Sequence, residues 1–149
     1  MPVIDPTKVP VKTDSIYPEP YAAMMKGRSS LRLGQAGGLT QFGANLVSLE
    51  PGALSSLRHW HLNEDEFVMV TEGECILVQD AGEAVMRAGD CAAFPAGSPD
   101  GHHFLNRSDH FLLVRDSHGA AFLRLRLSDT AVGFRLIHHP LRAAVPANI

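Results

Sequence analysis

Short runs of alternating hydrophobic and polar residues recur through the middle of the chain, and turns rich in glycine, aspartate and proline separate them. This spacing is typical of an antiparallel sandwich or barrel. No segment shows a strong helical period, which disfavours a parallel α/β sheet. The expected strands are residues 31–33, 39–49, 57–61, 66–71, 74–79, 84–87, 91–94, 102–106 and 111–115.

The two ends of the chain differ from this middle part. Residues 1–30 contain five prolines, which exclude a long helix or a central strand. We expect an extended arm with a short helical turn near residues 21–26, which wraps the barrel, crosses to a second subunit or forms a partly ordered tail. The barrel itself is expected over residues 31–116. In the tail, 117–149, alternation at 122–127 and 132–136 predicts two further strands that pair with each other or with a partner.

Composition narrows the class of protein. A chain of 149 residues with 45% hydrophobic and 19% charged residues fits one globular domain. The net charge is −3 and no basic run is present, so neither nucleic acid nor an anionic membrane is an expected partner. The first residues lack the apolar core of a signal peptide, and no apolar run approaches a membrane span. A cytoplasmic location is therefore expected.

The chain has two cysteines, Cys75 and Cys91, in different expected strands. They do not form a Cys-x-x-Cys motif, and a disulfide framework is disfavoured. We predict two free, buried thiols.

Four residues are candidate metal ligands. In a strand, His59 and His61 point to the same face. The polar residues 62–65 predict a turn, which resets the register and can bring Glu66 back beside the two imidazoles. His102 opens a later strand after a loop rich in glycine and proline. Together they offer a mixed nitrogen and oxygen set for one divalent transition metal, and the alternative is a polar cluster without metal.

These residues lie in two motifs that resemble those of the cupin superfamily. The residues that resemble the first cupin motif are Gly52, His59, His61, Glu66 and Gly73. Those that resemble the second are Gly89, Pro95, Gly97, His102 and Asn106. One extra residue separates Gly52 from His59, and two extra residues separate Gly97 from His102. The chain is similar to small bacterial single-domain cupins over roughly residues 31–115. The resemblance implies an all-β, antiparallel double-stranded jelly-roll barrel and a homodimer.

Two kinds of function follow from this resemblance. One is a metalloenzyme acting on a small molecule, dioxygenase-like or isomerase/lyase-like, with Fe, Mn, Ni, Zn or Cu as the metal. The other is a small-molecule binding or sensory module without turnover, because fold alone does not decide activity. No catalytic residue is assigned. Inward apolar residues expected to line the cavity are Val68, Val70, Leu77 and Phe104.

Overall fold

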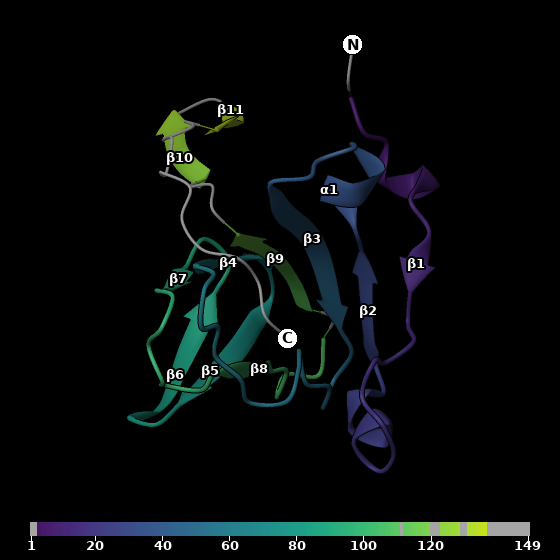
Figure 1. Cartoon of the computed structure of the whole chain (residues 1–149), viewed down its shortest axis with the longest axis vertical. Helices are drawn as coiled ribbons and strands as arrows, with labels where there is room; N and C mark the ends of the chain where they lie inside the picture. Colours follow the sequence, from purple (N-terminus) through teal and green to yellow (C-terminus); the bar gives the residue numbers. More distant parts are fainter. Residues whose placement is uncertain (1–2, 111, 120–122, 129–130, 137–149) are drawn as a thin grey trace.

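The computed structural model describes residues 3–110, 112–119, 123–128 and 131–136 (Figure 1). Among them, strands form a six-stranded sheet, a three-stranded sheet and a separate hairpin, and every pairing is antiparallel. The first sheet has the order β1 (Val11–Lys12), β2 (Arg28–Leu31), β3 (Phe42–Leu49), β9 (Leu112–Gly119), β4 (Glu66–Glu72) and β7 (Cys91–Phe94). The second has the order β6 (Gly82–Arg87), β5 (Glu74–Gln79) and β8 (His103–Leu105), and the hairpin is β10 (Leu123–Ser128) with β11 (Ala131–Leu136).

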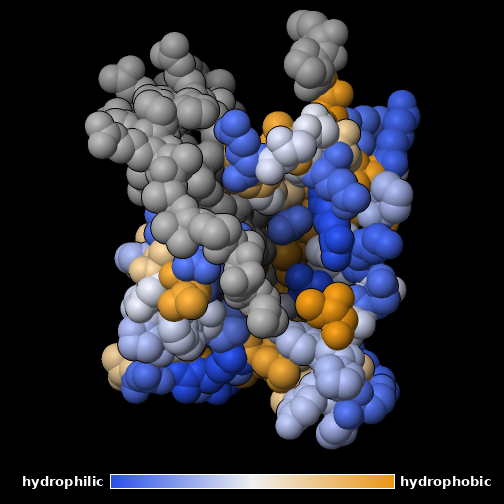
Figure 2. Space-filling model, viewed as in Figure 1, coloured by the Kyte–Doolittle hydropathy of each residue, from blue (hydrophilic) through white to orange (hydrophobic). Residues whose placement is uncertain are grey.

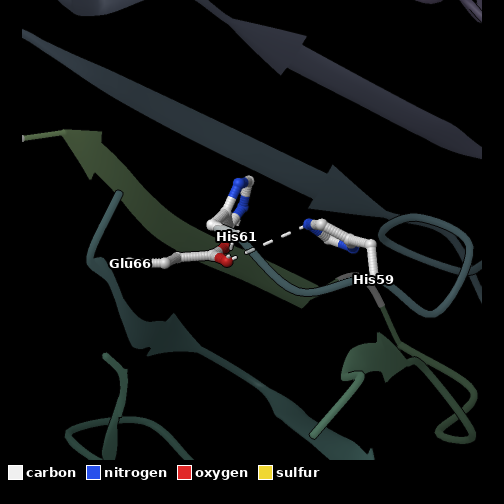
Figure 3. A group of neighbouring side chains, drawn as sticks. All are labelled: His59, His61 and Glu66. Atoms are coloured by element: carbon white, nitrogen blue, oxygen red, sulfur yellow. Dashed lines mark ion pairs between the residues drawn. The ribbon is translucent and has the colours of Figure 1, made fainter. Parts of the chain in front are cut away.

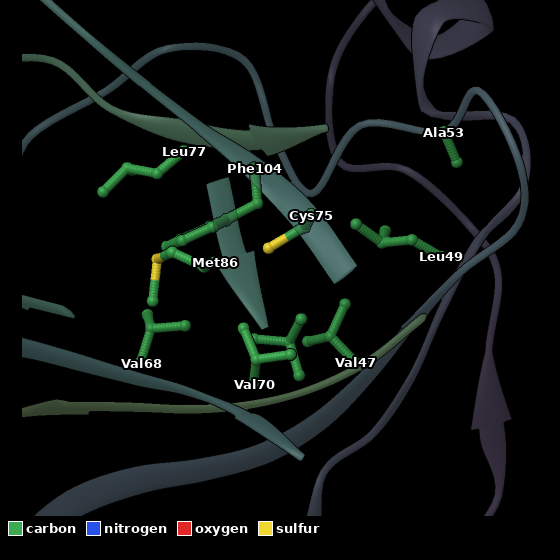
Figure 4. Close-up of a cluster of buried hydrophobic side chains, with 10 residues drawn as sticks. Val47, Leu49, Ala53, Val68, Val70, Cys75, Leu77, Met86 and Phe104 are labelled. Carbon is green, nitrogen blue, oxygen red and sulfur yellow. The ribbon is translucent and has the colours of Figure 1, made fainter. Parts of the chain in front are cut away.

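The hydrophobic core lies between the inner faces of the two larger sheets (Figure 4). Alternate residues of β4 are buried, as the pleat of a half-buried strand requires. The buried hydrophobic residues are Met25, Val47, Leu49, Ala53, Val68, Val70, Cys75, Leu77, Met86, Phe104 and Val114. The predicted all-β, antiparallel jelly-roll barrel is confirmed.

The N-terminal arm packs on the barrel of its own chain. After a 3₁₀ turn, η1 (Pro6–Lys8), β1 pairs with β2 and extends the larger sheet by an edge strand. A second 3₁₀ turn, η2 (Tyr21–Met25), confirms the helical turn predicted there. The arm therefore wraps the barrel, and in Figure 2 the surface over β1 and β2 is mainly hydrophilic.

Several predicted strands differ from the structure. The strand expected over 57–61 is a bent segment that touches its neighbour at two isolated bridges, Leu54 with Leu105 and His59 with His102. The reason is that side chains occupy carbonyls that a ladder would use: Arg28 Nε donates to the carbonyl of Ser55 (2.6 Å), and His59 Nδ1 lies 2.9 Å from the carbonyl of Leu57. In place of a strand over 31–33, β2 ends at Leu31 and a short helix, α1 (Leu33–Ala36), follows.

The predicted strand over 111–115 is found as the longer β9, with residue 111 outside the described residues. The two strands predicted in the tail pair with each other as β10 and β11. Residue 122, which also belongs to that prediction, lies outside the described residues.

Both cysteines are free, as predicted, and Cys75 is buried. The prediction of a buried Cys91 is wrong, because Cys91 is exposed. It lies on edge strand β7, where alternation turns Ala92 and Phe94 inward and Cys91 outward. Within the described residues, the helices are too short and too polar for any of them to cross a lipid bilayer.

Candidate metal centre

Three imidazoles converge on one carboxylate oxygen. Glu66 is the first residue of β4, and its Oε2 lies 3.2 Å from Nε2 of His61 and 4.0 Å from Nε2 of His59 (Figure 3). His102 directly precedes β8, and its Nε2 lies 2.8 Å from the same oxygen. The structure thus brings together all four residues singled out in the sequence. Their role as metal ligands stays a prediction.

The four side chains differ in exposure. Glu66 and His102 are buried, with side chains 5% and 1% exposed. His59 and His61 retain 32% and 25% exposure. The cluster therefore has a closed floor and a partly open side, and open access is what distinguishes a catalytic metal site from a structural one.

Hydrogen bonding fixes the tautomer of His59. Its Nδ1 lies 2.9 Å from the carbonyl of Leu57, which can only accept, so Nδ1 carries the proton and Nε2 keeps its lone pair. Ser56 Oγ is also 3.2 Å from this Nδ1. Burial lowers the pKa of His59, and this outweighs the hydrogen bond to Leu57 and the charge of Glu66, which raise it. The imidazole is therefore neutral near pH 7, as a metal ligand must be.

Two backbone hydrogen bonds hold His59 and His102 side by side. The amide of His59 donates to the carbonyl of His102 (3.2 Å), and the amide of His102 donates to the carbonyl of His59 (2.9 Å). This reciprocal pair holds the two histidine backbones together, with ring centroids 5.0 Å apart. Glu66 begins β4 of the six-stranded sheet and His102 directly precedes β8 of the three-stranded sheet, so strands of both sheets position the cluster.

The donor set fits a divalent cation. Ligand atoms of His59, His61 and Glu66 all lie within 4.8 Å of one another. Ligands about 2.0–2.2 Å from one ion lie about 3–3.5 Å apart at tetrahedral or cis octahedral angles, so binding would draw the most distant pair together by roughly 1 Å. The unprotonated Nε2 of His59 also faces the carboxylate of Glu66, an arrangement of two acceptors that a cation between them would stabilise.

An inner cavity of about 110 Å³ adjoins the cluster. Val68 and Phe104 line it, as predicted, together with Val47 and Val114. Val70 and Leu77, which strand alternation also predicts at the cavity wall, belong to the hydrophobic core instead.

Sequence reasoning missed the polar part of this wall, which Arg28, Ser55 and Ser56 supply. Arg28 lies in the segment predicted as an arm. A signal was present: Arg28, Ser30 and Arg32 alternate along a short run, which places polar side chains on one face of β2.

A family model and a solved structure both relate this chain to the cupins. The family model described as "Cupin domain" matches residues 45–114. A solved structure from Silicibacter pomeroyi, described as a sugar phosphate isomerase from a cupin superfamily, is 50% identical, covers 91% of this chain and 92% of its own, and superposes with a TM-score of 0.79.

Two further solved structures are more distant. A candidate sugar phosphate isomerase from Acidithiobacillus ferrooxidans is 25% identical, with coverage of 78% of this chain and 81% of its own and a TM-score of 0.60. A polyketide cyclase from Streptomyces resistomycificus is 20% identical, with coverage of 80% and 79% and a TM-score of 0.64, and this likeness shows the fold alone. Among proteins with curated descriptions, none matches the sequence significantly.

Proposed function

The chain belongs to the cupin superfamily, and on this premise we propose that it is a metal-dependent isomerase of a small hydroxycarbonyl compound, of the sugar phosphate class. The observation that carries the metal dependence is the convergence of three histidine Nε2 atoms on Oε2 of Glu66. The isomerase class is supported by the description of the 50% identical relative. It is favoured over dioxygenase chemistry because this relative is described as a sugar phosphate isomerase.

In this proposal His59, His61, Glu66 and His102 hold one divalent transition metal, and Fe, Mn, Ni, Zn and Cu all suit such a set. A divalent ion bound there would polarise a carbonyl or hydroxyl oxygen of the substrate. Glu66 offsets part of the ionic charge, and its burial shields the carboxylate from water.

The remaining wall of the inner cavity orients the substrate. Arg28 and the hydroxyls of Ser55 and Ser56 offer donors to substrate oxygens, while Val68 and Phe104 exclude water from the opposite side. Isomerisation of a hydroxycarbonyl compound moves one hydrogen between neighbouring carbons and one proton between their oxygens, and needs no further reactant. A cavity of about 110 Å³ beside the cluster is suited to the reacting end of such a molecule.

The first test is elemental analysis of untagged protein that has never met a chelating resin. The wild-type protein is compared with His59→Ala/His61→Ala, and with His110→Ala, which removes an exposed histidine outside the cluster. We expect near-stoichiometric metal in the wild type and in His110→Ala, and less than a tenth of that in the double variant. Absence of metal from all three after reconstitution would contradict the proposal.

Turnover is tested separately. Metal-loaded protein is incubated with a panel of sugar phosphates, and products are identified by NMR. Appearance of an isomer in the wild type but not in the double variant supports the isomerase. Bound metal with substrate binding but no product across the panel would favour the alternative, a binding or sensory module.

The protein is further proposed to act as a homodimer. Edge strand β1 and its flanks expose hydrophobic side chains, namely Val3, Val11 and Ile16. A second copy pairing at this edge would cover them. Light scattering that gives the mass of one chain would remove this part of the proposal.

A further inference from the structure

A second, larger cavity lies between the arm and the barrel. Its volume is about 260 Å³, far above the roughly 10–15 Å³ of such space that one water molecule needs. Residues 12–17 of the arm form one wall, and β2, β3 and the Ser55–Ser56 segment form the other. We call it the outer cavity.

The polar character of the outer cavity follows from strand register. Lys12 pairs with Ser30, Ser30 pairs with Val47, and Arg28 pairs with Leu49. Directly paired residues of an antiparallel sheet share a face. Lys12, Arg28 and Ser30 therefore face the same side as the core residues Val47 and Leu49. The inner face of this sheet is hydrophobic along β3 and becomes cationic at β2 and β1.

The charges around the outer cavity are unbalanced. Lys12, Arg28 and Arg32 line it, and Asp14 is the one acidic residue among the described residues that line it. Three positive charges and one negative charge leave two positive charges, in a chain whose net charge is −3. Lys12, Arg32 and Asp14 are exposed, whereas Arg28 is half-buried and Ser30 is 7% exposed. The lining of the outer cavity therefore favours an anionic ligand.

The outer cavity lies beside the inner one. Arg28, Ser55 and Ser56 line both. Arg28 Nε donates to the carbonyl of Ser55 (2.6 Å), which holds the guanidinium at the junction. Ser56 reaches the metal cluster from the same junction through its contact with Nδ1 of His59 (3.2 Å). A molecule that spans this junction would have one end at Arg28 and the other at the cluster.

We propose that the outer cavity binds a phosphoryl group of the substrate, through Lys12, Arg28 and Arg32, while the reacting carbons lie in the inner cavity beside His59 and Glu66. This assignment rests on the proposed function, because it places the two ends of one substrate. A phosphoryl group carries a charge of about −1.5 to −2 at pH 7, which suits a lining with three cationic side chains. Arginine also offers a planar fork of donors that suits phosphate oxygens.

The probe is inorganic phosphate, titrated into the full-length protein at low ionic strength and followed by NMR chemical shifts. The test variant is Lys12→Gln/Arg32→Gln, which neutralises two exposed side chains outside the metal cluster. The control is Arg87→Gln, which removes one positive charge from β6, where Arg87 pairs with Glu74 (3.0 Å). We expect phosphate binding to weaken at least 10-fold in the test variant, to strengthen about threefold in Asp14→Asn, and to stay within twofold in the control.

Acetate is titrated in parallel, because a carboxylate is the other anionic group that these cations could bind. We expect acetate to bind at least fivefold more weakly than phosphate. Equal or tighter binding of acetate would overturn the assignment to a phosphoryl group.

Metal analysis of the same samples separates this inference from the proposed function. Phosphate binding that persists in His59→Ala/His61→Ala supports an anion site separate from the metal. Binding that disappears in that variant and is unchanged in Lys12→Gln/Arg32→Gln would mean that phosphate binds the metal, and would overturn the inference. Phosphate binding in a protein that never takes up metal refutes the proposed metal dependence alone, whereas metal uptake without phosphate binding refutes the outer-cavity assignment alone.

Discussion

The ring of Phe94 lies flat against the imidazole of His102, with centroids 3.5 Å apart and planes 7° apart. Phe94 ends β7, the edge strand beside β4, and so lies opposite Glu66 in the sheet register. The same strand pairing that places Glu66 therefore also places the ring that orients its nearest histidine. Van der Waals contact over a whole ring face restricts rotation of His102 about its side-chain bonds.

Replacing Phe94 by Leu should weaken metal binding, because it keeps a hydrophobic side chain but removes the flat surface against His102. We expect about a 10-fold loss of metal affinity, at the lower end of the range for residues that support metal ligands. The measurement is competition with a chromogenic chelator. Phe104→Leu is the matched control: Phe104 meets Phe94 edge-on at 6.2 Å, and its loss should lower stability with little effect on affinity. Equal losses of affinity in the two variants would contradict the orienting role.

Asn106 is predicted to be structural. It is fully buried, and its Nδ2 donates to the carbonyls of Leu49 (2.9 Å) and His110 (2.8 Å) while Oδ1 accepts from the amide of Ser108 (3.0 Å). Asn106→Ala leaves buried carbonyls without these donors and should cost about 2–4 kcal/mol in the free energy of unfolding. Urea denaturation measures this loss.

Ser108→Ala is the control for Asn106, because it keeps Asn106 and removes the hydroxyl that donates to Oδ1 (2.7 Å) and accepts from the amide of His110 (3.3 Å). Its cost should be about 1 kcal/mol. Metal content of the folded Asn106→Ala protein should equal that of the wild type. A selective loss of metal with little change in stability would show that Asn106 acts on the metal cluster.

The two thiols should react very differently with Ellman's reagent at pH 8. Burial raises the pKa of Cys75 to about 12, so the folded protein keeps this thiol protonated and enclosed. Partial desolvation raises the pKa of Cys91 as well, but its side chain is exposed and the reagent can reach it. We expect one thiol to react in the folded protein and two in denaturant, with Cys91→Ser abolishing the first reaction.

The raised pKa of Cys75 also predicts how the stability of the folded protein changes with pH. The unfolded chain releases the thiol proton near the ordinary cysteine pKa, whereas the folded chain holds it until about pH 12. Unfolding is therefore increasingly favoured as pH rises from about 9. Cys75→Ala should show a shallower decline in stability over this range, and an identical decline would exclude the buried thiol as its cause.

Gly27 should tolerate alanine less well than Gly38 does. Both have a positive φ, of 79° and 72°, so alanine costs about 1–2 kcal/mol at either position. At Gly27 an added Cβ would also lie 3.1 Å from Cβ of Ala53 and 3.1 Å from Cβ of Glu50, whereas nothing lies within 4 Å at Gly38. We expect Gly27→Ala to lose at least 1 kcal/mol more than Gly38→Ala in urea denaturation. Similar losses would show that the neighbours of Gly27 move aside.

Alternation predicted the central strands well because their two faces have different surroundings. Buried and less buried residues alternate within β4 from Glu66 to Val70 and within β5 around Cys75 and Leu77, so both strands follow directly from the order of residues. His59 and His61 were predicted on one strand face, and both reach Glu66, although the segment that carries them is bent. Arg28, 27 residues before Ser55, donates to the Ser55 carbonyl at the start of this segment, and no local pattern reveals that contact.

The outer cavity could be predicted from the local sequence pattern even less than this segment. Lys12, Arg28 and Arg32 become neighbours only because β1 pairs with β2, and β1 is two residues long. A pairing so short has no period that could be recognised, and the surrounding prolines argue against a strand. Only the alternation of Arg28, Ser30 and Arg32 pointed to a polar inner face.

One wall of the outer cavity comes from residues 12–17, whereas the four converging side chains come from residues 59–102. These two parts of the chain can therefore vary independently in evolution. Substitutions in the arm would change the size and charge of the molecules admitted while the histidine and glutamate cluster stays intact. In an engineered protein, exchanging the arm is accordingly the simplest way to redirect substrate choice without rebuilding the chemistry.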